Sequence, residues 1–205
     1  MASRVFSLVV FALLLASALG PARAQEGPRD IVSRLNETLI GVMRQAEALG
    51  YEGRYERLAP VLEGTFDFPR MAQISVGRHW RELDQGQRER LTAIFGRMSI
   101  ATFAARFDGY SGERFNILGE ERAPRQAVLV RNQLIKSDGD AIEINYLLRE
   151  REGAWRVLDI FLDAKYSEMA MKRSEYSSVI KAKGFEGLIQ ALEAKIAELA
   201  TRKGG

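Results

Sequence analysis

The run from Asp84 to Tyr110, DQGQRERLTAIFGRMSIATFAARFDGY, constrains the fold more than any other part of this chain. Asp84 and Gln87 have the spacing of an N-terminal capping box, which marks the start of a helix. One apolar face of that helix is formed by residues that recur at helical spacing: Leu91, Ile94, Phe95, Met98, Thr102 and Ala105. The pattern predicts a long helix with an amphipathic first half.

The second half of this predicted helix is apolar on nearly every side. Ile100, Phe103 and Phe107 point roughly opposite to the first face, because each helical residue turns by about 100°. A helix of this kind is covered on both sides. We expect other helices on one side and a sheet or an apolar cavity on the other. Taken alone, the pattern also fits an ordinary solid core.

Residues 1–24 have the features of a secretory signal peptide. Arg4 supplies positive charge, an apolar run extends from Val5 to Leu19, and Ala22-Arg23-Ala24 fits an A-x-A cleavage site. The run is shorter than the roughly 20 residues of a membrane-spanning helix. We predict cleavage near Ala24, export to the periplasm, and one mature domain over residues 25–205.

Composition narrows the classes of function open to the mature chain. The sequence contains no cysteine, which excludes disulfides and thiolate metal sites. Removal of Arg4 and Arg23 leaves 28 basic and 27 acidic residues, a net charge of +1. No basic face or aromatic stacking motif indicates a nucleic-acid partner.

The remaining pattern reads as helices, then strands, then helices. Helical spacing covers Arg29 to Leu49 and continues from Tyr51 to Leu62, where Pro60 should break or kink it, and a short helix follows Phe66. Two further helices, separated by Gly184, close the chain. Four short runs of roughly alternating apolarity lie between, at Arg114–Leu118, Ala127–Ile135, Ile142–Leu148 and Trp155–Leu162. The predicted fold is α+β, with a curved four-stranded antiparallel sheet packed on helices.

Few residues are candidates for catalysis. His79 is the only histidine, so neither a catalytic triad nor a two-histidine metal site can form. Alternation places Asp159 on one strand face with Val157 and Phe161, which predicts partial burial and a candidate general base. Such a carboxylate more often pairs with a neighbouring donor. We predict no catalytic residue, no metal site and no cofactor.

Bulky apolar residues are concentrated where the sheet should meet the helices. Several are flexible or aromatic, the kind that adapts to an irregular ligand, although a solid core has the same composition. The residues that we predict to line an apolar lipid pocket are Met71, Ile74, Phe95, Met98, Phe103, Phe107, Phe115, Val128, Val130, Ile142, Ile144 and Tyr146.

An ordered series of short matches, spread over nearly all of the mature chain, resembles the MlaC (toluene-tolerance) family of periplasmic lipid-binding proteins. The matching residues are Phe66-Asp67-Phe68, Met71-Ala72, Gly77-Arg78-His79-Trp80-Arg81, Gln87-Arg88, Phe95, Thr102-Phe103-Ala104, Tyr110, Trp155-Arg156-Val157, Asp159, Ser167, Arg173, Tyr176 and the segment from Gly184 to Leu192. No single match is diagnostic, but their order and spacing are specific.

The resemblance implies a fold related to nuclear transport factor 2 with a deep apolar pocket. It also implies a monomeric carrier that shuttles a phospholipid between an inner-membrane lipid transporter and an outer-membrane donor or acceptor complex. This chain departs from the family pattern at Phe103, often Tyr, and at Asp163-Ala164, often Asp-Gly. The stretch from Ala104 to Phe115 is closer to the branch associated with hopanoid biosynthesis, so the implied ligand is a phospholipid or a hopanoid.

Two other functions stay open on the sequence. One is a small-molecule enzyme of the same fold, with Asp159 as base and Tyr146 or Tyr110 as its hydrogen-bonding partner. The other is a ligand-free adaptor of the cell envelope.

Overall fold

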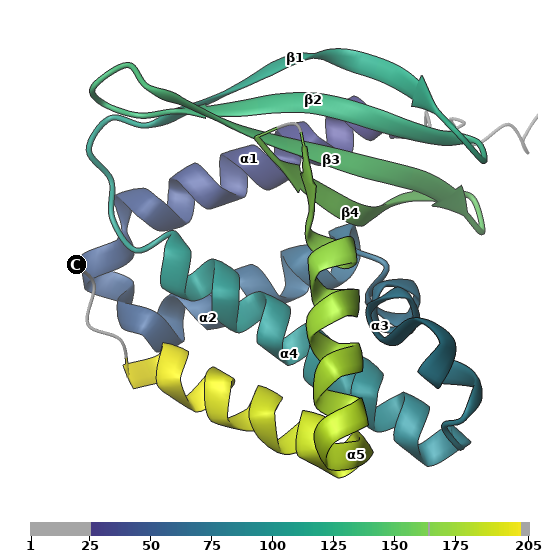
Figure 1. Cartoon of the computed structure of the whole chain (residues 1–205). Helices are drawn as coiled ribbons and strands as arrows, with labels where there is room; N and C mark the ends of the chain where they lie inside the picture. The colour runs from purple at the N-terminus through teal and green to yellow at the C-terminus, as the bar shows by residue number, and fades with distance from the viewer. Residues whose placement is uncertain (1–25, 164, 202–205) are drawn as a thin grey trace, which may run out of the picture.

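A five-stranded antiparallel sheet lies across a layer of helices (Figure 1). The computed structural model describes residues 26–163 and 165–201, so the predicted signal peptide lies outside the described residues. The elements are α1 (Pro28–Arg44), α2 (Ala46–Thr65), α3 (Phe68–Val76), the 3-10 helix η1 (Gly77–Arg81), α4 (Gln85–Arg106), β1 (Arg114–Ala123), β2 (Ala127–Ile135), β3 (Ala141–Arg151), β4 (Ala154–Leu162), β5 (Tyr166–Ser167) and α5 (Glu168–Thr201). The α+β prediction is confirmed. No described helix is both long and apolar enough to cross a membrane.

The predicted interruption at Gly50 is present, because Gly50 is non-helical inside α2 with a φ of 59°. A further interruption was not predicted: α1 ends at Arg44, with Gln45 as its C-cap. Pro60 lies within a helix that continues to Thr65, so of the predicted break or kink at Pro60 the break is wrong. Pro60 is exposed, and water can therefore satisfy the carbonyl group that its missing N–H leaves unpaired.

The central helix α4 starts where its capping residues predict. The Asp84 carboxylate accepts a hydrogen bond from the Gln87 backbone N–H at 2.8 Å, and the Gln87 side chain accepts one from the Asp84 N–H at 3.0 Å. At the other end of the chain, α5 changes direction at Gly184, with a φ of 71°. The two predicted C-terminal helices are thus the two arms of α5.

The sheet is a meander in the order β1-β2-β3-β4-β5, with one strand more than predicted. The missed strand β5 has only two residues, which is too short for alternation to show, and it pairs with the end of β4. β1 extends to Ala123 instead of ending at Leu118, because a bulge between Ile117 and Gly119 interrupts its alternation. The four-strand prediction is corrected to five strands.

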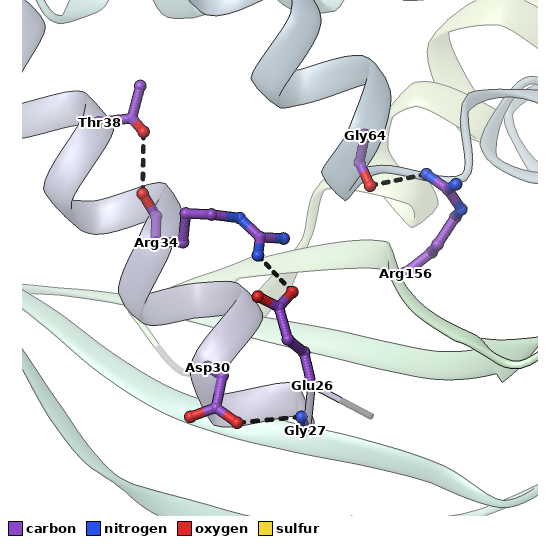
Figure 2. Close-up of polar contacts among 7 residues, drawn as sticks. All are labelled: Glu26, Gly27, Asp30, Arg34, Thr38, Gly64 and Arg156. Carbon is purple, nitrogen blue, oxygen red and sulfur yellow. Dashed lines mark hydrogen bonds and ion pairs between the residues drawn. The ribbon is translucent and has the colours of Figure 1, made fainter. Parts of the chain in front are cut away.

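Polar contacts join the helical layer to the sheet. The Arg156 guanidinium on β4 donates to the Gly64 carbonyl of α2 at 2.7 Å (Figure 2). The Asn36 amide of α1 donates to the buried Asn132 side chain of β2 at 2.9 Å. At the start of α1, Glu26 pairs with Arg34 (Figure 2). α1 is therefore held against β2, and the end of α2 against β4.

Candidate functional site

A pocket of about 500 Å³ lies between the inner face of the sheet and the helices. The inner face is defined by strand pairing, which aligns Leu134 with Ile142, Tyr146 with Ile160, and Ile144 with Leu162. All six of these residues line the pocket, and α1, α3, α4 and α5 supply the opposite wall. Its volume falls within the roughly 300–1,000 Å³ of small-molecule sites.

The closed end of the pocket is apolar and buried. Phe66, Met71, Tyr146 and Met169 line it and expose 3% of their surface or less. The Tyr146 hydroxyl is buried without a hydrogen-bond partner among the described residues, and burial raises the pKa of this phenol. A buried hydroxyl without a partner destabilises the protein, and it offers a hydrogen bond to a molecule in the pocket.

The open end of the pocket carries charges of both signs. Arg106, Lys136 and Lys172 line it together with acidic residues that include Asp108 and Glu168. Lys136 is engaged by two aspartates of its own turn, at 3.3 and 3.5 Å. In the part of the chain that the structure describes, no hydrogen bond or ion pair engages the side chain of Arg106 or of Glu168. An apolar interior with a charged mouth suits an amphiphile with its polar end at the surface.

The twelve residues predicted to line a pocket divide into two groups. Six line the observed pocket: Met71, Phe103, Phe107, Ile142, Ile144 and Tyr146. The other six lie outside its lining: Ile74, Phe95, Met98, Phe115, Val128 and Val130. Phe95 and Val130 expose 1% and 0% of their surface, so the Phe95 ring and the Val130 methyl groups belong to the filled core beside the pocket. Phe115 lines a separate groove between α1 and β1.

Several pocket residues were not predicted. Ser99, Thr102 and Arg106 on α4 line the wall, as do Glu168 and Lys172 on α5. The Ser99 and Thr102 hydroxyls donate to carbonyl groups of α4 itself, at 2.8 Å each, so their methylene and methyl groups are free to face an apolar ligand. Polar residues give no signal in an apolar pattern. Their spacing on α4, three to four residues apart, is the signal that a search for one helix face would use.

Asp159 is occupied by structural hydrogen bonds and is absent from the pocket lining. Its carboxylate accepts hydrogen bonds from the Ser167 hydroxyl at 2.6 Å and from the Ile160 and Met169 backbone N–H groups at 2.8 and 3.0 Å. Burial raises the pKa of Asp159, and these hydrogen bonds oppose the rise. Ser167 in turn accepts from the Ala170 N–H at 2.9 Å and so caps α5. Asp159 therefore fastens the start of α5 to the sheet.

The strand face predicted for Asp159 needs a correction. The register shifts at Leu147 and Leu148, so that Val157 pairs with Leu148 while Asp159 pairs with Leu147. Val157 and Asp159 consequently lie on opposite faces, and the prediction that they share one is wrong. Simple alternation fails here because the bulge inserts one extra residue into β4.

Among the described residues, the lining of the pocket includes no histidine and no cluster of metal-ligating side chains. His79 is 8% exposed, and its Nδ1 atom lies 2.9 Å from a Glu82 carboxylate oxygen. No group of three or more histidine, cysteine, aspartate or glutamate side chains within residues 26–163 and 165–201 is placed to hold a metal ion. The described chemistry of the pocket is thus apolar contact, one buried hydroxyl and a charged mouth.

The fold and the pocket together define a class of protein: an α+β domain that encloses an apolar hollow between an open sheet and its helices. The particular family follows from the sequence, because the MlaC protein family profile matches residues 33–194. The chain belongs to the MlaC family, and the resemblance seen in the sequence is confirmed.

Comparison with solved structures gives the same fold. A phospholipid-binding protein from Ralstonia solanacearum, solved in complex with a phospholipid, matches with a TM-score of 0.73 and 19% sequence identity. The match covers 83% of this chain and 97% of that one. At this level of identity the likeness establishes the fold. No curated protein matches the chain.

Proposed function

We propose that this protein is a carrier that binds a lipid by its apolar part and moves it between membranes. The observation that carries the proposal is the pocket itself, whose closed end is apolar and whose mouth is charged. Burial of hydrocarbon contributes roughly 25 cal/mol per Å² of surface removed from water, so such a pocket binds acyl chains without strong polar contacts. Membership of the MlaC family and the phospholipid bound by the structural relative support the same reading.

The carrier works in the periplasm under this proposal. Its predicted signal peptide ends near Ala24, and cleavage there releases a mature chain that begins near Gln25. Its partners are an inner-membrane lipid transporter and an outer-membrane donor or acceptor complex, and it acts as a monomer. N-terminal sequencing of exported protein tests the predicted cleavage and export, and material that still begins at Met1 contradicts them.

Phospholipid is the ligand that we propose. The free guanidinium of Arg106 and the ammonium group of Lys172 at the mouth complement a phosphate. A hopanoid is the second candidate, because the stretch from Ala104 to Phe115 resembles the branch associated with hopanoid biosynthesis. The lipid extracted from the protein distinguishes the two.

The enzyme reading has less support. It needs the Asp159 carboxylate to take a proton from a ligand, but three donors already bind its oxygens and it does not line the pocket. The adaptor reading needs a filled interior, whereas this interior holds a hollow of about 500 Å³.

Transfer of lipid between vesicles tests the proposal directly. Donor vesicles contain a labelled phosphatidylethanolamine, and acceptor vesicles contain none. A carrier raises the transfer rate in proportion to protein concentration and leaves the lipid chemically unchanged. Transfer no faster than without protein supports the adaptor, and a new lipid species detected by mass spectrometry supports the enzyme.

A further inference from the structure

The buried hydroxyl of Tyr146 belongs to the deep part of the pocket. Along β3, the exposed fraction of the pocket-lining side chains falls from 38% at Ile142 to 0% at Tyr146, with the half-buried Ile144 between them. β3 therefore leads from the mouth of the pocket to its closed end. Four residues of strand span roughly 13 Å, at about 3.3 Å per residue. A ligand group that reaches Tyr146 consequently lies far from the charged mouth.

Two further side chains with unpaired polar atoms lie in the same part of the interior. Among the described residues, five buried side-chain nitrogen or oxygen atoms lack a hydrogen-bond partner, and three of them belong to Asn36, Asn132 and Tyr146. These side chains expose 6%, 0% and 0% of their surface. The Asn36 amide donates to Asn132 at 2.9 Å, which leaves an acceptor on Asn36 and a donor on Asn132 without a partner.

The strand register places Asn132 beside residues of the pocket. The register that pairs Val130 with Tyr146 continues along β2 and β3, so Asn132 lies opposite Ile144. Asn132 is bonded to Asn36 of α1 and therefore points toward the helices, as Tyr146 does. The two side chains are thus diagonal neighbours on the inner face, a spacing of about 7–8 Å. We call Tyr146, Asn132 and Asn36 the polar cluster.

A plain hydrocarbon chain leaves the polar cluster unsatisfied. A buried hydroxyl without a partner costs free energy, and methylene groups cannot form its missing hydrogen bond. A chain that carries a hydroxyl group gives Tyr146 a partner, and the adjacent free amide groups keep the surroundings of that group polar. Elsewhere in the pocket the same hydroxyl group meets apolar walls, where its burial is unfavourable. The cluster therefore favours an oxygen atom at one depth of the chain.

We propose that Tyr146 selects lipids whose acyl chain carries a hydroxyl group at the depth of the polar cluster. The Tyr146 hydroxyl donates a hydrogen bond to the oxygen of that group, while the head group stays at the charged mouth. The inference rests on the proposed carrier function, and it assigns the ligand class as a lipid with a hydroxylated acyl chain.

A series of matched lipids tests the proposal. The probes are phosphatidylethanolamines with stearoyl chains: one unmodified, a set with a hydroxyl group moved along the distal half of one chain, and one with the hydroxyl group next to the ester. Each is added to delipidated protein, and native mass spectrometry measures its affinity. One distal position should bind wild-type protein at least about threefold more tightly than the unmodified lipid. The hydroxyl group next to the ester should give no gain, because it lies near the mouth.

Two tyrosine variants identify the group responsible. Tyr146→Phe should lower the affinity ratio of the preferred hydroxylated lipid to the unmodified lipid at least about tenfold, because the ligand hydroxyl is then buried without its donor. Tyr176→Phe is the matched control, since Tyr176 is also buried, at 2% exposed, but lies outside the pocket lining. This control should leave the ratio unchanged.

The outcomes separate this inference from the carrier function. If no hydroxyl position binds more tightly than the unmodified chain, or if Tyr146→Phe leaves the ratio unchanged, the proposal is overturned and the carrier function stands. A water molecule that satisfies Tyr146 permanently would give the first of these results. Should Tyr146→Phe not fold, the wild-type series decides alone. Failure of wild-type protein to bind any of the lipids overturns the carrier function, and this inference with it.

Discussion

The two parts of α4, before Ser99 and from Ser99 on, differ in what covers them. In the first part Leu91, Ile94 and Phe95 are almost fully buried, and the Phe95 ring meets Phe68 of α3 edge-to-face at 6.2 Å. In the second part Thr102 and Phe103 line the pocket. Both parts contain large apolar residues, yet the first packs in a filled core and the second borders a hollow.

This contrast teaches that a substitution has different consequences in a filled core and beside an unfilled pocket. In a filled core, removal of atoms leaves a cavity and addition of atoms causes strain. Beside a hollow, added atoms occupy free space and compete with a ligand instead. The same kind of substitution in the two parts of α4 should therefore give opposite results for stability and for lipid content.

The largest effect is expected in the filled core. Phe95→Ala should lower the free energy of unfolding by about 3–5 kcal/mol, because it leaves a large cavity beside Phe68. Urea denaturation measures this loss. Lipid content per folded molecule should stay unchanged, since Phe95 does not line the pocket. Depletion of lipid without loss of stability would show that the filled and hollow parts of α4 are wrongly assigned.

A matched pair one helical turn apart gives the next largest effect. Met98 lies outside the pocket lining and packs on the core, whereas Thr102 lines the pocket. Met98→Trp should cost about 1–3 kcal/mol by overpacking and keep its lipid. Thr102→Trp should cost less than about 1 kcal/mol and reduce co-purified lipid at least about tenfold. Thermal unfolding and lipid extraction measure the two quantities, and identical behaviour of the pair would remove the distinction.

Much of the fold could be predicted from the sequence, because caps, periodicity and turn residues act locally. Asp84 with Gln87 located the start of α4, and alternation placed Ile142, Ile144 and Tyr146 on one strand face. The continuous helix at Pro60 could not be predicted, because solvation of the helix near Pro60 depends on which side of α2 is exposed.

The site was harder to predict than the fold. Alternation finds the inner face of a strand but not the helix that covers each part of it. Val130 is on the same face as Tyr146, yet α1 covers β2 near Asn132, so Val130 is core. The charged mouth was missed because Arg106 and Lys172 carry no periodic apolar signal.

Substitution of Asp159 should lower the free energy of unfolding moderately, without any effect on catalysis. Asp159→Asn keeps the shape but replaces the oxygen that accepts the Ser167 hydroxyl proton by an amide donor, which should cost about 1–2 kcal/mol. Lipid transfer by folded protein should be unchanged. A variant that still binds lipid but has lost a measurable conversion of it would establish the enzyme instead.

The pH dependence of that cost has a definite sign. Burial raises the pKa of Asp159 in the folded state, so the folded protein holds this proton more tightly than the unfolded chain does. Its contribution is fully present below the unfolded pKa of 3.8 and is lost as pH rises through the raised folded pKa. The stability difference between wild type and Asp159→Asn should therefore shrink from acidic to neutral pH. Urea denaturation at several pH values measures it, and a difference that grows with pH would contradict this account.

The smallest effect is expected from one atom at the closed end of the pocket. Tyr146→Phe removes a buried hydroxyl that has no partner among the described residues. Delipidated protein should become more stable by up to about 1 kcal/mol, because an unsatisfied polar group is lost. If the hydroxyl bonds the ligand, lipid-loaded protein should gain less. Equal gains in the two states would show that the hydroxyl does not contact lipid.

The central claim is that the hollow beside α4 is filled by lipid when the protein is isolated. Mass spectrometry of an organic extract tests it most directly, applied to wild-type protein and Thr102→Trp purified from the periplasm without detergent. The account predicts near-stoichiometric phospholipid from the wild type and a strongly depleted extract from the folded variant. A folded wild-type protein that yields no lipid, or a variant that carries as much lipid as the wild type, would contradict it.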